Sequence, residues 1–151
     1  MARTLSILLV EDDANDVLLV RRAFQRTRSG IPVFVVSNGL EAVKYLCGEA
    51  PYADRSQNPF PDIVLLDLNM PKMNGLEVLK WVRSRPEMKR LPIIVLTTSV
   101  QEEDARQAYE AGANSFVVKP SDFTQFLEAI RSLGDFWLDG TRLPTIHPNQ
   151  G

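Results

Sequence analysis

Five short apolar runs constrain the fold more than any other feature of the sequence. They are Leu5–Val10, Val33–Val36, Ile63–Leu66, Ile93–Leu96 and Phe116–Val118. Apolar and polar residues do not alternate within these runs, so we expect each to be a strand with both faces buried. Strands buried on both faces are typical of a parallel sheet that helices cover on each side.

The segments between the runs change to the apolar spacing of amphipathic helices. Gly75–Arg83 carries an apolar stripe and ends before Pro86, and Glu102–Ala111 is expected to stop at Gly112. The last helix is expected to begin after a cap at Ser121 or Asp122. A strand followed by a helix, repeated five times, predicts an α/β three-layer sandwich with a five-stranded parallel sheet and right-handed crossovers.

The chain of 151 residues has the length of one domain. We expect that domain to span residues 1–134, with residues 135–151 as a C-terminal extension too short to form an output domain. The formal net charge of −2 weighs against a nucleic-acid or anionic-membrane partner. No segment is apolar enough for a membrane span or a signal peptide, which predicts a cytoplasmic protein. Cys47 is the single cysteine, and we expect it in or near the core.

Polar residues follow the apolar runs where each strand is expected to end. They are Glu11-Asp12-Asp13, Asp67, Thr97 and Lys119. In a doubly wound sheet, ligands bind beyond the carboxyl ends of the strands, so these side chains are expected to converge at one edge.

Carboxylates gathered at one edge repel each other and need a positive partner. Two such charges 4 Å apart cost roughly 4 kcal/mol at an effective dielectric constant near 20. An all-oxygen site suits Mg²⁺. Mg²⁺ and Lys119 together offset the charges of Glu11, Asp12 and Asp67, and the order of the residues favours Glu11 and Asp12 over Asp13 as the acidic pair.

These motifs resemble the receiver domains of two-component response regulators. The resemblance is carried by Leu8–Asp13, by Asp67–Pro71 with Gly75, by Thr97 after Ile94–Leu96, and by Val118–Pro120. It covers about residues 5 to 134. It implies the flavodoxin-like strand order 2-1-3-4-5.

The resemblance also implies roles for individual residues. Asp67 is expected to accept a phosphoryl group from the phosphohistidine of a sensor kinase. Asp12, Asp67 and the carbonyl of Asn69 are expected to bind Mg²⁺, with Glu11 completing the acidic pair.

Three further roles follow from the same resemblance. Lys119 is expected to pair with the phosphoryl oxygens, and the Lys119–Pro120 bond is expected to be cis. Thr97 is expected to bond the phosphoryl group, while Phe116 changes rotamer. The protein is then a phosphoacceptor with weak self-catalysed phosphotransfer and dephosphorylation, not a dedicated enzyme.

A narrower resemblance concerns single-domain regulators of phytochrome histidine kinases. It is carried by Gly48–Ala53, Asp67–Asn69, Leu96–Ser99 and Asp135–Leu138. It implies a red-light-sensing kinase as the phosphoryl donor. We also expect a homodimer through the fourth helix, fifth strand and fifth helix, extended by Phe136, Trp137 and Leu138.

Other interpretations remain open for several of these residues. An Asp-nucleophile phosphatase is one, although Asn69 stands where such enzymes need a second acid. A receiver-like binding module that never takes phosphate is another. Asp13 and Asp16 are best explained as solvated residues at a helix start. Thr97 and Phe116 also fit plain structural roles.

Overall fold

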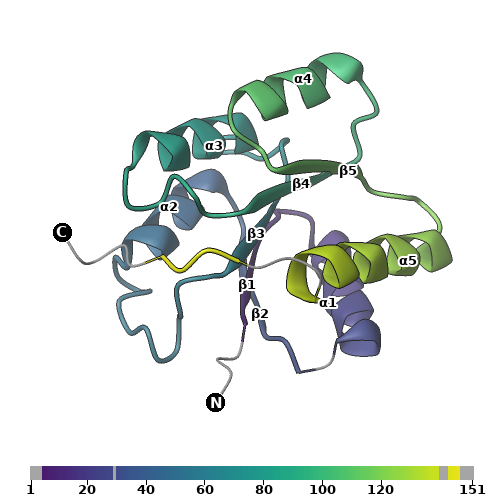
Figure 1. Ribbon diagram of the computed structural model, residues 1–151, viewed down its shortest axis with the longest axis horizontal. Coiled ribbons are helices and arrows are strands. Elements are labelled where there is room, and N and C mark those ends of the chain that lie inside the picture. The colour runs from purple at the N-terminus through teal and green to yellow at the C-terminus, as the bar shows by residue number, and fades with distance from the viewer. Residues whose placement is uncertain (1–4, 29, 140–142, 147–151) are drawn as a thin grey trace.

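Five parallel strands form one sheet in the order β2-β1-β3-β4-β5 (Figure 1). The computed structural model describes residues 5–28, 30–139 and 143–146. The strands are β1 (Ile7–Val10), β2 (Val33–Val36), β3 (Ile63–Leu66), β4 (Ile93–Thr97) and β5 (Ser115–Val118). Val10 pairs with Val36 and Leu66 in register, so the strands carrying the acidic residues end side by side. The predicted strand order is confirmed.

Helices cover both faces of the sheet. In Figure 1, α1 (Ala14–Thr27) and α5 (Phe123–Gly134) lie on one face. The helices α2 (Gly39–Cys47), α3 (Gly75–Ser84) and α4 (Glu102–Glu110) lie on the other. The result is the expected three-layer sandwich. Within the described ranges, no helix has both the length and the apolar character needed to cross a membrane.

The sheet separates two hydrophobic cores, which explains the absence of alternation in the strand sequences. Ile7 and Leu9 face the core beneath α1 and α5, whereas Leu8 and Val10 face the core beneath α2, α3 and α4. All four are buried. Burying an aliphatic side chain of this size contributes about 1.5–3 kcal/mol.

Most helices begin at a side chain that caps their first turn. Asp13 accepts hydrogen bonds from the backbone N–H groups of Asn15 and Asp16 and caps α1. Asn74 and Glu77 form a capping box at the start of α3. Asp122, one of the two candidates, caps α5.

The loop before β3 is held by partly buried hydrogen bonds. Tyr45 Oη donates to the carbonyl oxygen of Pro59 at 2.9 Å, and Tyr52 Oη donates to Glu41 at 2.6 Å. Arg55 donates to the carbonyl oxygen of Tyr45 at 2.8 Å. The loop is therefore anchored on α2, in which Cys47 is half-buried.

The chain after α5 folds back on the domain. A π-helical turn, η1 (Asp135–Asp139), continues α5, and Arg28 at the end of α1 binds Asp135 and Asp139 at 2.5 and 2.6 Å. Leu143 packs against the core beneath α1 and α5, and Ile146 against the opposite core. Residues 1–4 of the expected domain and residues 140–142 and 147–151 of the expected extension lie outside the described residues.

Candidate functional site

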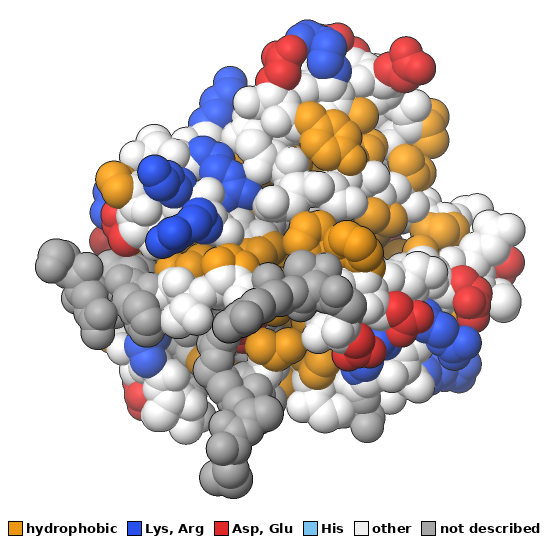
Figure 2. Space-filling model, in the orientation of Figure 1, with side chains coloured by type: hydrophobic (Ala, Val, Ile, Leu, Met, Phe, Trp, Pro, Cys, Tyr) orange, Lys and Arg blue, Asp and Glu red, His pale blue; other side chains and the backbone are white. Residues whose placement is uncertain are grey.

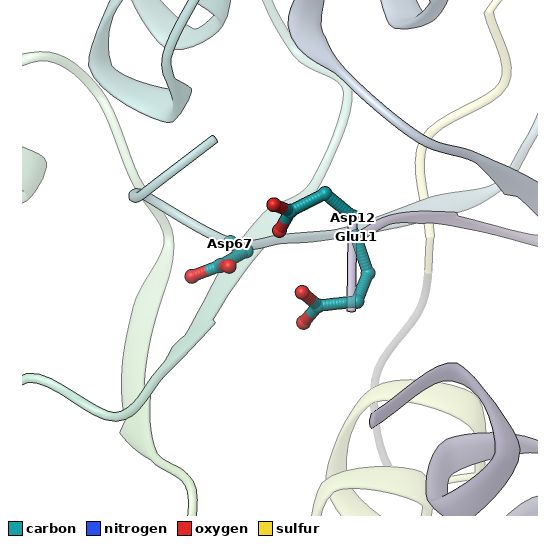
Figure 3. Close-up of side chains that lie close together, drawn as sticks. All are labelled: Glu11, Asp12 and Asp67. Atoms are coloured by element: carbon teal, nitrogen blue, oxygen red, sulfur yellow. The ribbon is translucent and has the colours of Figure 1, made fainter. Parts of the chain in front are cut away.

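Three carboxylates meet at the carboxyl edge of the sheet. Glu11 and Asp12 directly follow β1, Asp67 directly follows β3, and one oxygen from each lies within 4.8 Å of the others. Figure 3 shows the three side chains extending from the ends of the two strands. Glu11 and Asp67 are only 3% and 8% exposed, whereas Asp12 is exposed. The cluster therefore opens to solvent on the side of Asp12.

Lys119 brings a positive charge to this cluster from the end of β5. Its ammonium group donates hydrogen bonds to Glu11 and to Asp16, the latter at 2.8 Å. Its backbone N–H donates to the carbonyl oxygen of Thr97 at 2.7 Å. The expected cis bond at Lys119–Pro120 is wrong, because Ala50–Pro51 is the only cis bond within the described residues. Lys119 reaches the acids with the intrinsically favoured trans bond.

Burial shapes the protonation of this cluster. Burial raises the pKa of Glu11 to about 7, against the opposing effect of Lys119, and the nearby charge of Asp67 raises it further. Burial alone lowers the pKa of Lys119, but its bonds to Asp16 and Glu11 outweigh this effect and the pKa is raised. Lys119 therefore keeps its positive charge. Three carboxylates with no nitrogen or sulfur ligand fit a hard divalent cation such as Mg²⁺.

The loop after β3 is packed tightly beneath Asp67. The backbone N–H of Asn69 points to Asp67 Oδ1 at 3.4 Å, and the backbone N–H of Gly75 donates to the carbonyl oxygen of Leu68 at 3.0 Å. A Cβ atom at Gly75 would lie 2.8 Å from Leu68 Cα and even closer to the carbonyl oxygen of Asp67. Only glycine fits here, and Asn69 remains exposed beside Asp67.

Thr97 and Phe116 lie on the neighbouring strands β4 and β5. Thr97 is fully buried, and its hydroxyl oxygen accepts a hydrogen bond from the backbone N–H of Ser99 at 3.3 Å. Phe116 is half-buried against the core beneath α2, α3 and α4. Its backbone N–H donates to the Tyr109 hydroxyl oxygen. Phe116 pairs in register with Val95, two residues before Thr97, so Thr97 and Phe116 lie near each other on adjacent strands.

The two acidic residues at the start of α1, Asp13 and Asp16, have different roles. Asp13 caps α1 as expected, whereas the expectation that Asp16 is only a solvated residue is wrong, because it binds Lys119. Asp104 was not anticipated at all, and it accepts a 2.5 Å hydrogen bond from Ser99. The available signal was position: the first turns of α1 and α4 follow strand ends, so their acids lie near the same edge.

The surface formed by α4, β5 and α5 carries exposed apolar residues. Tyr109 on α4 and Val118 on β5 are 52% and 39% exposed, and Val100, in the loop just before α4, is 79% exposed. Figure 2 shows hydrophobic side chains gathered in the region of α4 and β5. In the extension, Phe136 is 61% exposed, while Trp137 and Leu138 pack partly against the core of their own chain.

A 2-1-3-4-5 sheet with an acidic cluster and one buried lysine at its carboxyl edge defines a receiver domain of two-component signalling. The family described as "Response regulator receiver domain" matches residues 7–131, and the chain belongs to this family.

Relatives in this family include a cyanobacterial response regulator with a solved structure. The response regulator Rcp1 of Synechocystis sp. is 34% identical over 91% of this chain and 92% of its own. Its Mn²⁺-bound crystal structure superimposes with a TM-score of 0.84, at 33% identity over 93% of this chain and 99% of that chain.

Two further solved structures are similar. The phosphorylated cyanobacterial phytochrome response regulator RcpA has a TM-score of 0.88 and 36% identity, over 95% of this chain and all of its own. The regulator RPA3017, in red light signaling of R. palustris, has a TM-score of 0.89 and 37% identity, over 93% of this chain and 99% of its own. The expected similarity to phytochrome response regulators is confirmed.

Proposed function

We propose that this receiver domain accepts a phosphoryl group on Asp67 in a Mg²⁺-dependent reaction with a histidine kinase. The observation that carries the proposal is the position of Asp67. Its buried carboxylate lies at the sheet edge within 4.8 Å of those of Glu11 and Asp12. Lys119 provides the compensating positive charge beside them.

The same cluster supplies the ligands for the metal ion. Asp12, Asp67 and the carbonyl of Asn69 would hold Mg²⁺, with Glu11 beside them. When bound, the ion offsets negative charge on the carboxylates and on the phosphoryl oxygens. The Mn²⁺-bound form of Rcp1 supports a divalent-cation site in this family.

Phosphoryl transfer then requires little chemistry from the protein beyond position and charge. A carboxylate oxygen of Asp67 forms a bond to phosphorus as the phosphorus–nitrogen bond of the donor's phosphohistidine breaks. The bonding electrons return to the imidazole. Lys119 and Thr97 stabilise the phosphoryl oxygens in the mixed anhydride. Attack by water on this anhydride resets the protein, which acts as a signalling phosphoacceptor and not as an enzyme with its own substrate.

Phosphorylation changes the surface formed by α4, β5 and α5 in this proposal. Thr97 moves toward the phosphoryl group, and Phe116 turns into the space that it leaves. The exposed apolar residues of this surface form a homodimer contact. Among the three residues of the extension, Phe136 is the most available for that contact, because Trp137 and Leu138 pack partly against the core of their own chain.

The proposed donor is a phytochrome-type histidine kinase. The printed descriptions of RcpA and RPA3017, which name a phytochrome and red light, support this choice. The protein would act in the cytoplasm through protein contacts, without nucleic acid or membrane partners. Residues 1–134 would form the receiver and residues 135–151 a C-terminal extension.

Intact-protein mass spectrometry after incubation with acetyl phosphate and Mg²⁺ tests the phosphoacceptor. One added phosphoryl group is expected in the wild type and in Asp13→Asn, and none in Asp67→Asn. An unmodified wild type would support a binding module instead. Rapid turnover of phosphomonoesters would support a phosphatase.

Size-exclusion chromatography with light scattering tests the homodimer. A dimer is expected for the wild type, with a weaker dimer for Phe136→Ala. A wild type that stays monomeric at micromolar concentrations, with and without beryllofluoride, contradicts this part of the proposal.

A further inference from the structure

The ammonium group of Lys119 is bound on the side of α1 and not on Asp67. Within the described residues, its ion pairs are with Glu11 and Asp16. Lysine has three N–H donors, and these two acceptors occupy two of them. The group needed to neutralise a phosphoryl oxygen on Asp67 is therefore already engaged with two carboxylates.

The two carboxylates differ in how easily they can release Lys119. The side chain of Glu11 is 2% exposed and also accepts a hydrogen bond from the backbone N–H of Asp13. The side chain of Asp16 is 27% exposed, so water can replace Lys119 as its partner. Breaking the Lys119–Glu11 pair would leave a buried carboxylate without its ion-pair partner and out of reach of water, which costs more than hydrating the partly exposed Asp16.

We propose that Asp16 is a positioning residue that holds Lys119 on α1 in the unphosphorylated protein and competes with the phosphoryl group for it. This inference rests on the proposed function, because it concerns the same reaction. The incoming phosphoryl oxygens displace Asp16 and leave the Lys119–Glu11 pair intact. Asp16 thereby lowers the affinity of the site for a phosphoryl group.

The sign of the effect follows from electrostatics. Replacing Asp16 by Asn removes a competitor for Lys119 and a negative charge near the incoming anion, and both changes favour phosphoryl binding. The same loss of negative charge cannot strengthen the binding of Mg²⁺, which is a cation. If Asp16 had only a structural role, its replacement would weaken the binding of both the phosphoryl group and Mg²⁺. Measuring both affinities therefore separates a structural role from competition for Lys119.

Asp13→Asn is the matched control. It removes one negative charge from the same turn, while Asn caps a helix as well as Asp does. The Asp13 side chain caps α1, and Lys119 is not among its partners. Any general effect of charge on the site therefore appears in both variants.

The experiment measures the dissociation constant of beryllofluoride, a phosphoryl mimic, by ¹⁹F NMR at saturating Mg²⁺, and that of Mg²⁺ alone by calorimetry. Asp16→Asn should bind beryllofluoride about two- to fivefold more tightly than Asp13→Asn, the range expected for losing one partly exposed ion pair. Mg²⁺ binding should be unchanged or weaker in both variants.

Lysine ¹³Cε NMR gives a second readout. Without ligand, the Lys119 signal of Asp16→Asn should move toward its position in beryllofluoride-bound wild type, and that of Asp13→Asn should not. Asp16→Ser serves as a second variant if Asp16→Asn folds poorly.

Each outcome decides between explanations. Equal or weaker beryllofluoride binding by Asp16→Asn, relative to Asp13→Asn, overturns the inference. A wild type that binds no beryllofluoride contradicts the proposed function itself, independently of Asp16.

Discussion

Tyr109 in α4 is joined to β5 by a hydrogen bond from the backbone N–H of Phe116 to the Tyr109 hydroxyl oxygen, at 3.1 Å. β5 is an edge strand, so this N–H has no neighbouring strand to bond. The hydroxyl therefore satisfies an edge donor and ties α4 to the residue proposed to switch.

Tyr109→Phe should loosen this connection. Removing the hydroxyl returns the Phe116 N–H to water and costs about 0.5–1.5 kcal/mol of unfolding free energy. Amide hydrogen exchange at Phe116 should accelerate more than exchange at Val95 on the adjacent strand. Equal acceleration at both positions would instead indicate a general loss of stability.

Divalent metal should stabilise the protein through the acidic cluster. A ligand that binds only the folded state raises the melting temperature, so a chelator should lower it in the wild type. Asp12→Asn removes a charged ligand and should weaken Mg²⁺ binding by at least about tenfold. Its melting temperature should then respond little to Mg²⁺, whereas Asp13→Asn should retain the response. An undiminished response in Asp12→Asn would place the ion elsewhere.

Gly75→Ala should destabilise the protein by crowding the backbone of Asp67 and Leu68. The new methyl group would meet the carbonyl oxygen of Asp67 and Leu68 Cα, which are backbone atoms that cannot rotate away. Such overpacking costs about 1–3 kcal/mol, measured by urea denaturation. Gly30→Ala is the matched control, since a Cβ there meets no atom within 4 Å. Equal stability of the two variants would contradict the close approach at Gly75.

Arg28→Ala should release the turn after α5. Its partners Asp135 and Asp139 are well exposed, so the lost ion pairs are worth only about 0.5–1 kcal/mol. The fluorescence of Trp137 should nevertheless shift to the red as its contact with the core weakens. The measurement uses a Trp81→Phe background, since Trp81 is the only other tryptophan. Arg131→Ala, which removes an exposed pair with Glu128, should leave the emission unchanged.

Stability should fall between pH 10 and 12 because of two tyrosines. Burial raises the pKa of Tyr45 from 10.0 to about 12, and burial, with the bond to Glu41, raises that of Tyr52 to about 12. Since the unfolded chain loses these protons first, the stabilisation is complete below pH 10 and is lost as the pH rises toward 12. Urea denaturation across this range should show a shallower decline for Tyr45→Phe. An identical decline would show that Tyr45 does not contribute.

The sequence by itself determined the sheet and the edge at which the chemistry gathers. Ile63–Leu66 is apolar throughout because both of its faces are covered, and that local property predicts the strand and places Asp67 at its end. Parallel pairing of β1 with β3 then brings Glu11 and Asp12 beside it.

Only the tertiary structure decided how these residues pair. Lys119 and Asp16 are 103 residues apart, and their contact depends on where α1 lies against the end of β5. The backbone isomer at Lys119–Pro120 and the return of Trp137 onto its own core also depend on packing between distant elements. Apolar spacing specifies which face of an element is buried, but it contains no information on which polar side chains meet at its ends.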